Sequence, residues 1–210
     1  AADYAYYLEY VKPQFAFVDE QSLTAFDTAL AGTRHCGRGG GVDNVIAAAP
    51  DTAGHKAFDA WIARKPKAGA EPWPTRKDDP AVWLFTSGTT GQSKGAVHCH
   101  FHFPFNTEVY AKRVIGMREN DVAVSGARLF FGYATGTNLM FPFAVGATSI
   151  LFREQPSPEL LFEQIAKHKA TVFTSVPTFI NKMLQAPKDQ RRDVSSVRFM
   201  WSAGEALPRE

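Results

Sequence analysis

Val82-Trp83-Leu84-Phe85 is an apolar run that leads directly into Thr86-Ser87-Gly88-Thr89-Thr90-Gly91-Gln92-Ser93-Lys94-Gly95. The apolar run predicts a buried strand, and the residues after it combine glycines and hydroxyl side chains with one lysine. Glycine lets a backbone approach an anion and turn its N–H groups inward, and lysine adds a compact positive charge. The pattern predicts a phosphate-binding loop whose candidate ligands are Thr86, Ser87, Gly88, Thr89, Thr90, Gly91 and Lys94.

The spacing of this loop is G-x-x-G-x-x-K, which differs from the G-x-x-x-x-G-K-[ST] spacing of P-loop NTPases. It resembles the phosphate loop of the adenylate-forming enzymes, which include acyl- and aryl-CoA ligases, luciferases and the adenylation domains of peptide synthetases. A flexible linker is the alternative for a Gly/Ser/Thr segment, but the preceding strand favours nucleotide binding.

The second half of the chain alternates short apolar runs with helical patterns. Strands are expected at 82–86, 121–124, 148–152, 171–175 and 197–201. Helices are expected at 100–115, 137–143 (ended with the help of Pro142 and Gly146), 158–169 (capped by Ser157) and 177–185. This alternation predicts an α/β fold of layered βα units with largely parallel, buried sheets, which the resemblance assigns to the N-terminal domain of adenylate-forming enzymes.

The first eighty residues carry a weaker signal. A helix is expected at 4–10, a strand at 14–18 and a second helix at 22–30 with Ser22 as its cap. The Gly37–Gly41 segment is read as an irregular loop, with phosphate binding as the alternative. We therefore expect a partial first subdomain plus a proline-rich linker over 1–80, and a phosphate-loop and acyl-pocket subdomain, truncated at its C-terminal end, over 81–210.

A second motif, Ser202-Ala203-Gly204-Glu205-Ala206-Leu207-Pro208, follows the apolar run 198–201. Small residues at the carboxyl end of a strand leave room for a planar ligand to lie on the backbone. A plain glycine turn is the alternative. The resemblance implies that Gly204, Glu205 and Ala206 flank adenine and that Gly204 also closes one wall of an acyl pocket.

A third motif, Leu129-Phe130-Phe131-Gly132-Tyr133-Ala134-Thr135-Gly136, joins aromatic residues to small ones. Such clusters usually belong to a core. Aryl-CoA ligases face the acyl group at this position, and the segment is most similar to those that act on benzoate. The resemblance implies that Phe131, Tyr133 and Ala134 contact the substrate ring. Because the segment carries no charge, a plain or lightly substituted benzoate is favoured.

Two further motifs suggest other kinds of site, a metal site and a hydrolase active site. His98-Cys99-His100-Phe101-His102 suggests a metal site, but the spacing suits a single site poorly and no matching His/Cys pair occurs elsewhere, so no metal-ligating residue is predicted. Ser87 as a hydrolase nucleophile is disfavoured because the G-x-S-x-G frame is absent.

The composition of the chain argues against two classes of partner, nucleic acid and membrane. The net charge is +2 and the charged fraction 21%, which argues against nucleic acid as a partner. The uncharged stretch between Arg128 and Arg153 is interrupted by glycines and a proline, which argues against a membrane span. Only two cysteines occur, in no paired pattern, as is typical of a cytoplasmic protein.

The resemblance implies a two-step reaction that uses ATP, Mg²⁺ and coenzyme A. An aryl carboxylate becomes an acyl-adenylate with release of pyrophosphate, which Lys94 stabilises, and coenzyme A then displaces AMP. The ligands of Mg²⁺ and ribose and a catalytic lysine are expected after Glu210. The 210-residue piece is therefore expected to be inactive without the remainder of the enzyme, including its C-terminal domain. An adenylation domain serving a carrier protein and a non-catalytic nucleotide-binding fragment are the alternatives, and a homodimer is left open.

Overall fold

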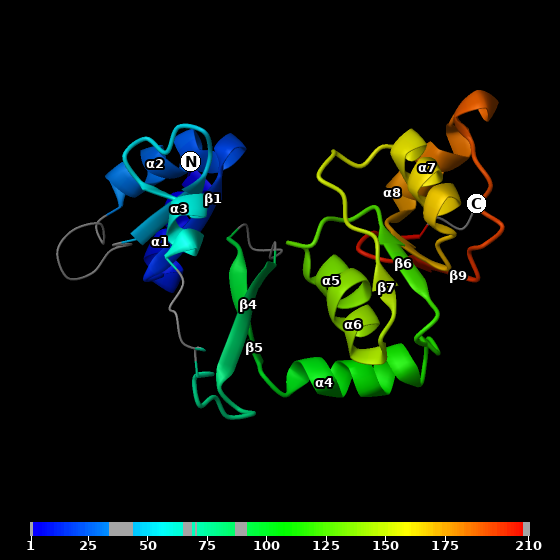
Figure 1. The fold of residues 1–210 in the computed structure, drawn as a ribbon, viewed down its shortest axis with the longest axis horizontal. Coiled ribbons are helices and arrows are strands. Elements are labelled where there is room, and N and C mark those ends of the chain that lie inside the picture. Colours follow the sequence, from blue (N-terminus) through cyan, green and yellow to red (C-terminus); the bar gives the residue numbers. More distant parts are fainter. Residues whose placement is uncertain (1, 34–43, 65–68, 70, 87–91, 208–210) are drawn as a thin grey trace. The chain divides into compact units, whose positions relative to one another are not determined.

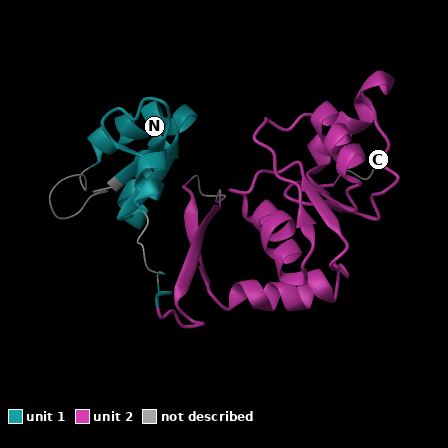
Figure 2. Ribbon diagram, viewed as in Figure 1, with its two compact units in different colours: residues 1–73 teal, residues 74–210 magenta. Residues whose placement is uncertain are grey.

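The computed structural model describes residues 2–33, 44–64, 69, 71–86 and 92–207. Contacts divide the chain into two compact units, Ala1–Trp73 and Pro74–Glu210 (Figure 2). The boundary between the units, at Trp73 and Pro74, lies inside the stretch 1–80 that was predicted to contain the first subdomain and a linker. The subdomain division predicted at residue 80 stays a prediction.

The first unit packs three helices on a small parallel sheet. The sheet has the order β1-β2-β3, and the elements in chain order are α1 (Ala2–Val11), β1 (Phe15–Asp19), α2 (Glu20–Gly32), β2 (Asn44–Ala48), β3 (Lys56–Ala57) and α3 (Phe58–Ala63). Leu8, Leu23 and Phe26 from the helices pack on Val18 and Val45 from the strands. Gly37–Gly41 lies outside the described residues.

The N-terminal cap of helix α2 differs from the predicted one. Asp19 is its cap, because the Asp19 carboxylate accepts a hydrogen bond from the backbone N–H of Ser22 at 2.8 Å. The prediction that Ser22 caps the helix was wrong. A carboxylate at this position satisfies an otherwise unpaired N–H and also suits the positive end of the helix dipole.

The second unit begins with an antiparallel hairpin. Strand β4 (Pro80–Thr86) pairs with β5 (Lys94–Cys99), and the two form a sheet of their own. Thr86 stands opposite Lys94 at the end of the hairpin. The predicted strand thus has an antiparallel partner, whereas the other two sheets contain parallel pairs.

Two helical stretches follow the hairpin (Figure 1). They consist of α4 (His102–Asn106) with the π-helical turn η1 (Thr107–Lys112), and α5 (Gly132–Thr135) with the π-helical turn η2 (Gly136–Met140) and α6 (Phe141–Val145). The second stretch begins at Gly132, earlier than the predicted residue 137. Pro142 does not end it, because proline is tolerated in the first turn of α6. Gly146 ends it at φ +78°, a left-handed conformation that glycine adopts without strain.

The main sheet of the second unit is parallel, with the order β7-β6-β8-β9. Its strands and the helices between them are β6 (Val122–Ser125), β7 (Thr148–Ser149), α7 (Pro158–His168), β8 (Val172–Ser175), α8 (Pro177–Gln185), the 3₁₀ turn η3 (Lys188–Gln190) and β9 (Phe199–Ser202). Strand β7 is shorter than the predicted 148–152. The cap predicted for α7 is confirmed, because Ser157 Oγ accepts from the N–H of Leu160 at 3.2 Å.

Both faces of this sheet are covered. Val124 and Phe173 belong to a cluster with Leu161, Ile165 and Met183 of α7 and α8. Their neighbours in sequence, Ala123 and Val172, belong to a second cluster with Ala111, Ile115, Phe141 and Trp201. Successive strand residues point to opposite faces, which is why these strands are apolar without alternation. The predicted α/β class with largely parallel sheets is confirmed.

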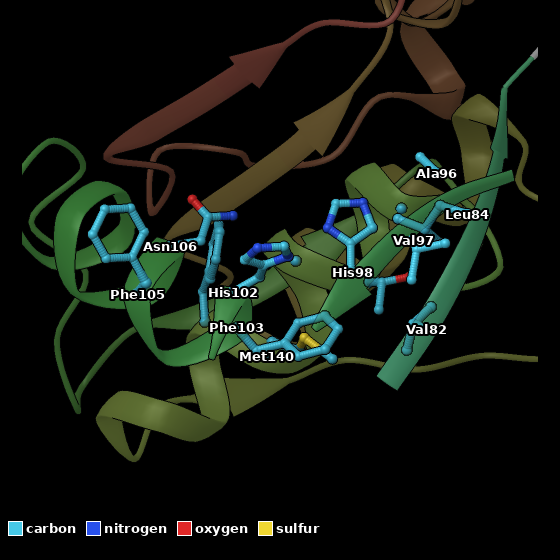
Figure 3. Close-up of a pocket in the computed structure, with 14 residues that line it drawn as sticks. Val82, Leu84, Ala96, Val97, His98, His102, Phe103, Phe105, Asn106 and Met140 are labelled. Atoms are coloured by element: carbon cyan, nitrogen blue, oxygen red, sulfur yellow. The ribbon is translucent and has the colours of Figure 1, made fainter. Parts of the chain in front are cut away.

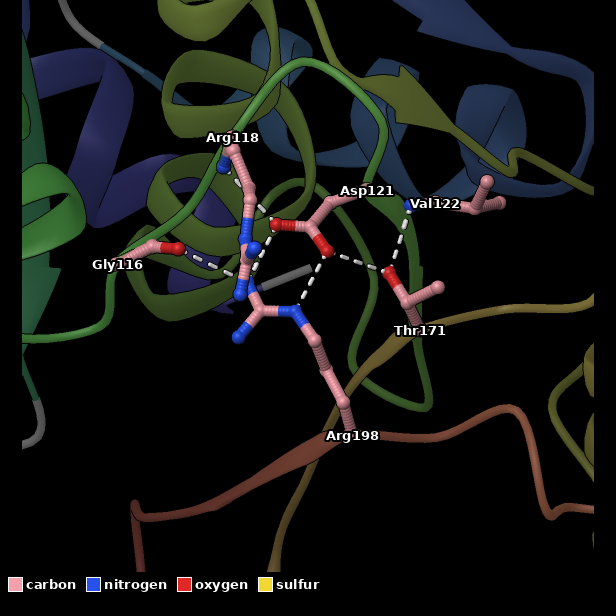
Figure 4. A network of polar contacts seen from close by, with 6 residues as sticks. All are labelled: Gly116, Arg118, Asp121, Val122, Thr171 and Arg198. Atoms are coloured by element: carbon pink, nitrogen blue, oxygen red, sulfur yellow. Dashed lines mark hydrogen bonds and ion pairs between the residues drawn. The ribbon is translucent and has the colours of Figure 1, made fainter.

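The beginnings of three strands meet at one buried carboxylate, Asp121, which is 2% exposed (Figure 4). Asp121 Oδ1 accepts from Arg198 Nε at 2.7 Å and from Thr171 Oγ1 at 2.8 Å. Asp121 Oδ2 accepts from the N–H of Arg118 at 2.9 Å and from Arg198 Nη2. Residues 121, 171 and 198 immediately precede β6, β8 and β9, so one side chain holds these strands together.

The pKa of Asp121 lies below its ordinary value. Burial by itself raises this pKa, but the hydrogen bonds from Arg198, the N–H of Arg118 and Thr171 together outweigh burial. A lowered carboxyl pKa means that its stabilisation is full above the pKa of the unfolded chain and is lost as the pH falls through the folded value.

No helix among the described residues is long and apolar enough to cross a membrane.

We expect Asp121→Asn to lower the free energy of unfolding at pH 7 by about 2 kcal/mol, because the charge-assisted bonds to Arg198 weaken. Chemical denaturation of the purified protein at pH 7 and at a series of lower pH values measures the difference from wild type. The difference should shrink as the pH falls through the lowered pKa of Asp121, because the wild-type carboxylate then becomes protonated too. The exposed Asp78 supplies the control, Asp78→Asn, which should change little. A loss of stability that does not depend on pH would contradict this account.

Candidate functional site

The carboxyl edge of the main sheet brings small residues together. Strands β6, β8 and β9 all end in serine, and Ser175 pairs with Ser202 in the register of β8 and β9. Ser175 is 1% exposed, and its Oγ has no hydrogen-bond partner among the described residues. A Cβ added at Gly126 would come within 2.8 Å of this Oγ, so glycine lets the chain after β6 pass close by. Ligands of parallel sheets bind at such carboxyl edges.

The segment predicted to flank adenine, Gly204–Ala206, follows the end of β9 at this edge of the sheet. Gly204 has φ +85°, a conformation that favours glycine, and an added Cβ would lie 3.4 Å from Val176 Cγ1. The N–H of Ala203 donates to the carbonyl of Ser175 at 3.3 Å. Gly204, Glu205 and Ala206 are all exposed, so their backbone is accessible to a ligand.

The Glu205 carboxylate is held by hydrogen bonds from Thr178. Its Oε2 accepts from the N–H of Thr178 at 3.0 Å, and its Oε1 accepts from the Thr178 hydroxyl at 2.8 Å. Thr178 lies in the first turn of α8. Glu205 was predicted from its motif, but Thr178 was not. The two residues are 27 positions apart, and the sequence around Thr178 carries no signal for a contact at that distance.

The predicted acyl wall lies at the start of α5. Phe131 is 55% exposed and its ring lies 4.5 Å from that of Phe130, whereas Ala134 is fully buried. The Tyr133 hydroxyl is buried without a partner among the described residues, and burial, followed by the nearby Tyr110, raises the pKa of Tyr133 to about 12. Of the three, Phe131 presents the most surface, and the ring contact predicted for Ala134 stays a prediction.

A pocket of about 490 Å³ is lined in part by residues of the same helical stretch (Figure 3). Its lining is mostly apolar and comes from the hairpin, from α4 and from Gly132, Thr135, Gly136, Met140 and Phe141. Gly132 matters here, because an added Cβ would come within 2.7 Å of Leu84 Cδ1 of β4. Phe131, Tyr133 and Ala134 are not among the residues that line the pocket. The hairpin and α4 residues that line this pocket were not among the predicted substrate contacts.

Two histidines of the His98–His102 motif line the same pocket. Their rings lie edge-on with centroids 5.5 Å apart, and His102 Nδ1 accepts from the N–H of Cys99 at 3.1 Å. That bond assigns the proton of a neutral His102 ring to Nε2. No three His, Cys, Asp or Glu side chains come together as a metal site within the described ranges.

The phosphate loop is described only at its two ends. Thr86 ends β4 and Lys94 begins β5, directly opposite each other, and both are exposed. Ser87, Gly88, Thr89, Thr90 and Gly91 lie outside the described residues. The predicted roles of Thr86 and Lys94 stay predictions, but the hairpin does bring a hydroxyl residue and a lysine to one end of one sheet.

The whole chain, residues 1–210, matches the family described as AMP-binding enzyme. It is 37% identical to a benzoate–CoA ligase of Thauera aromatica, over all of this chain and 38% of that protein. The structure of a benzoate CoA ligase from Burkholderia xenovorans LB400 superposes with a TM-score of 0.81 at 33% identity, over 99% of this chain and 39% of that one.

A second solved structure shows an acyl-adenylate in a similar protein. The anthranilate CoA ligase AuaEII, solved in complex with anthranoyl-AMP, superposes with a TM-score of 0.87 at 28% identity, over 99% of this chain and 39% of that one. The present chain thus spans about two fifths of the length of these relatives. Since the family match and the match to the benzoate–CoA ligase of Thauera aromatica both extend over the whole chain, the chain belongs to the AMP-binding enzyme family.

Proposed function

We propose that the protein carrying this chain activates benzoate, or a close aryl carboxylate, to a CoA thioester. The carboxylate attacks the α-phosphate of ATP to give an acyl-adenylate and pyrophosphate, and the thiol of coenzyme A then displaces AMP. The observation that carries the proposal is the match to a benzoate–CoA ligase over the entire chain. The chain corresponds to 38% of that relative, so the complete reaction is proposed for the protein as a whole.

We assign the pyrophosphate side of the first step to the end of the hairpin. Lys94 and Thr86 face each other there, and the predicted loop residues Ser87, Gly88, Thr89, Thr90 and Gly91 lie between them in sequence. Negative charge grows on the departing pyrophosphate, and an ammonium group and hydroxyl groups close to it would stabilise that charge. Mg²⁺ would accompany ATP, and we expect its ligands after Glu210.

We assign the adenine side to Gly204 and Ala206 and the acyl wall to Phe131, Tyr133, Ala134 and Gly204. The Tyr133 hydroxyl, with its pKa of about 12, stays protonated at neutral pH and is a donor there, not a base. The exposed Phe131 ring offers an aromatic face, which suits an aryl group.

We also propose a cytoplasmic location and a role in the breakdown of aromatic compounds. The free thiol of Cys99 supports a reducing compartment. A homodimer stays a prediction.

The direct test is benzoate-dependent pyrophosphate release from ATP by the full protein, with the thioester identified by mass when coenzyme A is added. Adenylate formation with transfer to a carrier protein but not to coenzyme A would favour an adenylation domain. Nucleotide binding without pyrophosphate release would favour a non-catalytic module.

Lys94→Ala should slow adenylation by about a hundredfold, the usual loss for one donor to developing charge. The measurement is benzoate-dependent exchange of pyrophosphate into ATP. Thioester formation from supplied benzoyl-adenylate should change far less, because pyrophosphate has already left. Lys182→Ala, at an exposed lysine in the last turn of α8, is the control. Equal losses in both half-reactions would overturn this role for Lys94.

Phe131→Ala should raise the KM for benzoate about tenfold, since an aromatic contact with the substrate ring is lost. Phe143→Ala is the control, because Phe143 is an exposed phenylalanine of α6 with no predicted contact with the substrate. Steady-state kinetics of both variants at saturating ATP and coenzyme A gives their KM values for benzoate. Similar KM values for the two variants would remove Phe131 from the acyl wall.

A further inference from the structure

Helix α8 begins without a cap of its own. Its cap residue is Val176, whose side chain has no hydrogen-bonding atom, and Pro177 is the first helical residue. The N–H groups of Phe179 and Ile180 donate to the carbonyl of Val176, which leaves the N–H of Thr178 without a backbone partner of this kind. The first N–H groups of a helix need acceptors from outside the helix.

Glu205 supplies the missing acceptor from 27 residues away. Its two carboxylate oxygens engage two donors of one residue, the N–H and the hydroxyl of Thr178, at 3.0 and 2.8 Å. A negative charge at this end of a helix is also favoured by the helix dipole. The Glu205 side chain is therefore fixed at both oxygens, although it is exposed.

The contact fastens the adenine-flanking segment to the junction of β8 and α8. The N–H of Ala203 donates to the carbonyl of Ser175, and Glu205 is bound to Thr178. Between these two residues lies Gly204, where an added Cβ would lie 3.4 Å from Val176 Cγ1. The left-handed turn at Gly204 lies between the two hydrogen-bonded ends, so its geometry is set by both.

We propose that Glu205 is a positioning residue for nucleotide binding: it acts through Thr178 to hold the Gly204–Ala206 backbone where adenine binds, and it does not itself contact the nucleotide. This inference rests on the proposed function. It gives Glu205 an indirect role in place of the direct contact that the resemblance implied: both carboxylate oxygens accept from Thr178, and a direct contact with the nucleotide is an outcome that the test below distinguishes.

The test compares three variants of the full protein. Glu205→Ala removes both bonds, Thr178→Val removes one, and Thr178→Ser keeps both. Loss of one ordered hydrogen bond predicts about a fivefold rise in the KM for ATP and in the Kd for AMP in Thr178→Val, and a larger rise in Glu205→Ala. Thr178→Ser keeps both hydrogen bonds and should bind ATP and AMP as the wild type does.

A second capped helix provides the matched control. Ser157→Ala removes the cap of α7, whose hydroxyl accepts from Leu160, and this site has no predicted contact with nucleotide. Ser157→Ala should lower the melting temperature, as Thr178→Val does, while leaving the KM for ATP and the Kd for AMP unchanged. That pair of results separates positioning from a general loss of stability.

Two outcomes would overturn the proposal. If Glu205→Ala weakens nucleotide binding but Thr178→Val does not, Glu205 contacts the nucleotide directly. If neither variant changes the Kd for AMP, the contact is only structural. A wild-type protein that binds AMP, measured by calorimetry, but releases no pyrophosphate with benzoate would refute the proposed function and leave the positioning test intact. A wild-type protein that does neither would refute both.

Discussion

The second unit depends on the neutralisation of one buried carboxylate. Asp121 is almost fully enclosed, and its charge is stable there only because Arg198, Thr171 and the N–H of Arg118 all donate to it. A buried charge without such partners would cost several kcal/mol. The same bonds join the beginnings of β6, β8 and β9, so the strands keep their register up to the opposite edge. Ser175 and Ser202 lie side by side at that edge because the strands are in register from their starts.

Local sequence patterns predicted the features that depend on neighbouring residues alone, such as strands and helix caps. The strand predicted at 171–175 is β8 at Val172–Ser175, and Ser157 before Pro158 marked the start of α7. Where two local signals competed, the sequence did not decide between them. Asp19 and Ser22 are both good caps, and the carboxylate is the one used. Pro142 suggested the end of a helix, although proline also fits the first turn of one, and Gly146 was the true stop.

The contacts that shape the candidate site join residues far apart in sequence. Arg198 and Asp121 are 77 residues apart, and Glu205 and Thr178 are 27 apart. Hydrophobic periodicity reports which side of an element faces the core, but it does not say which polar groups meet once the elements have packed. The motif around Gly204 was therefore recognisable, while its attachment to α8 and the pocket beside Gly132 became visible only in three dimensions.

The hairpin of β4 and β5 has a consequence for local opening. It forms a sheet separate from the four-stranded one, and two strands alone are only marginally stable in water. We therefore expect its backbone amides to exchange their hydrogens through local opening, and those of β8, which is buried on both faces, to exchange mainly on unfolding of the unit. A bound anion that bridges the two strands would slow that exchange without changing the fold.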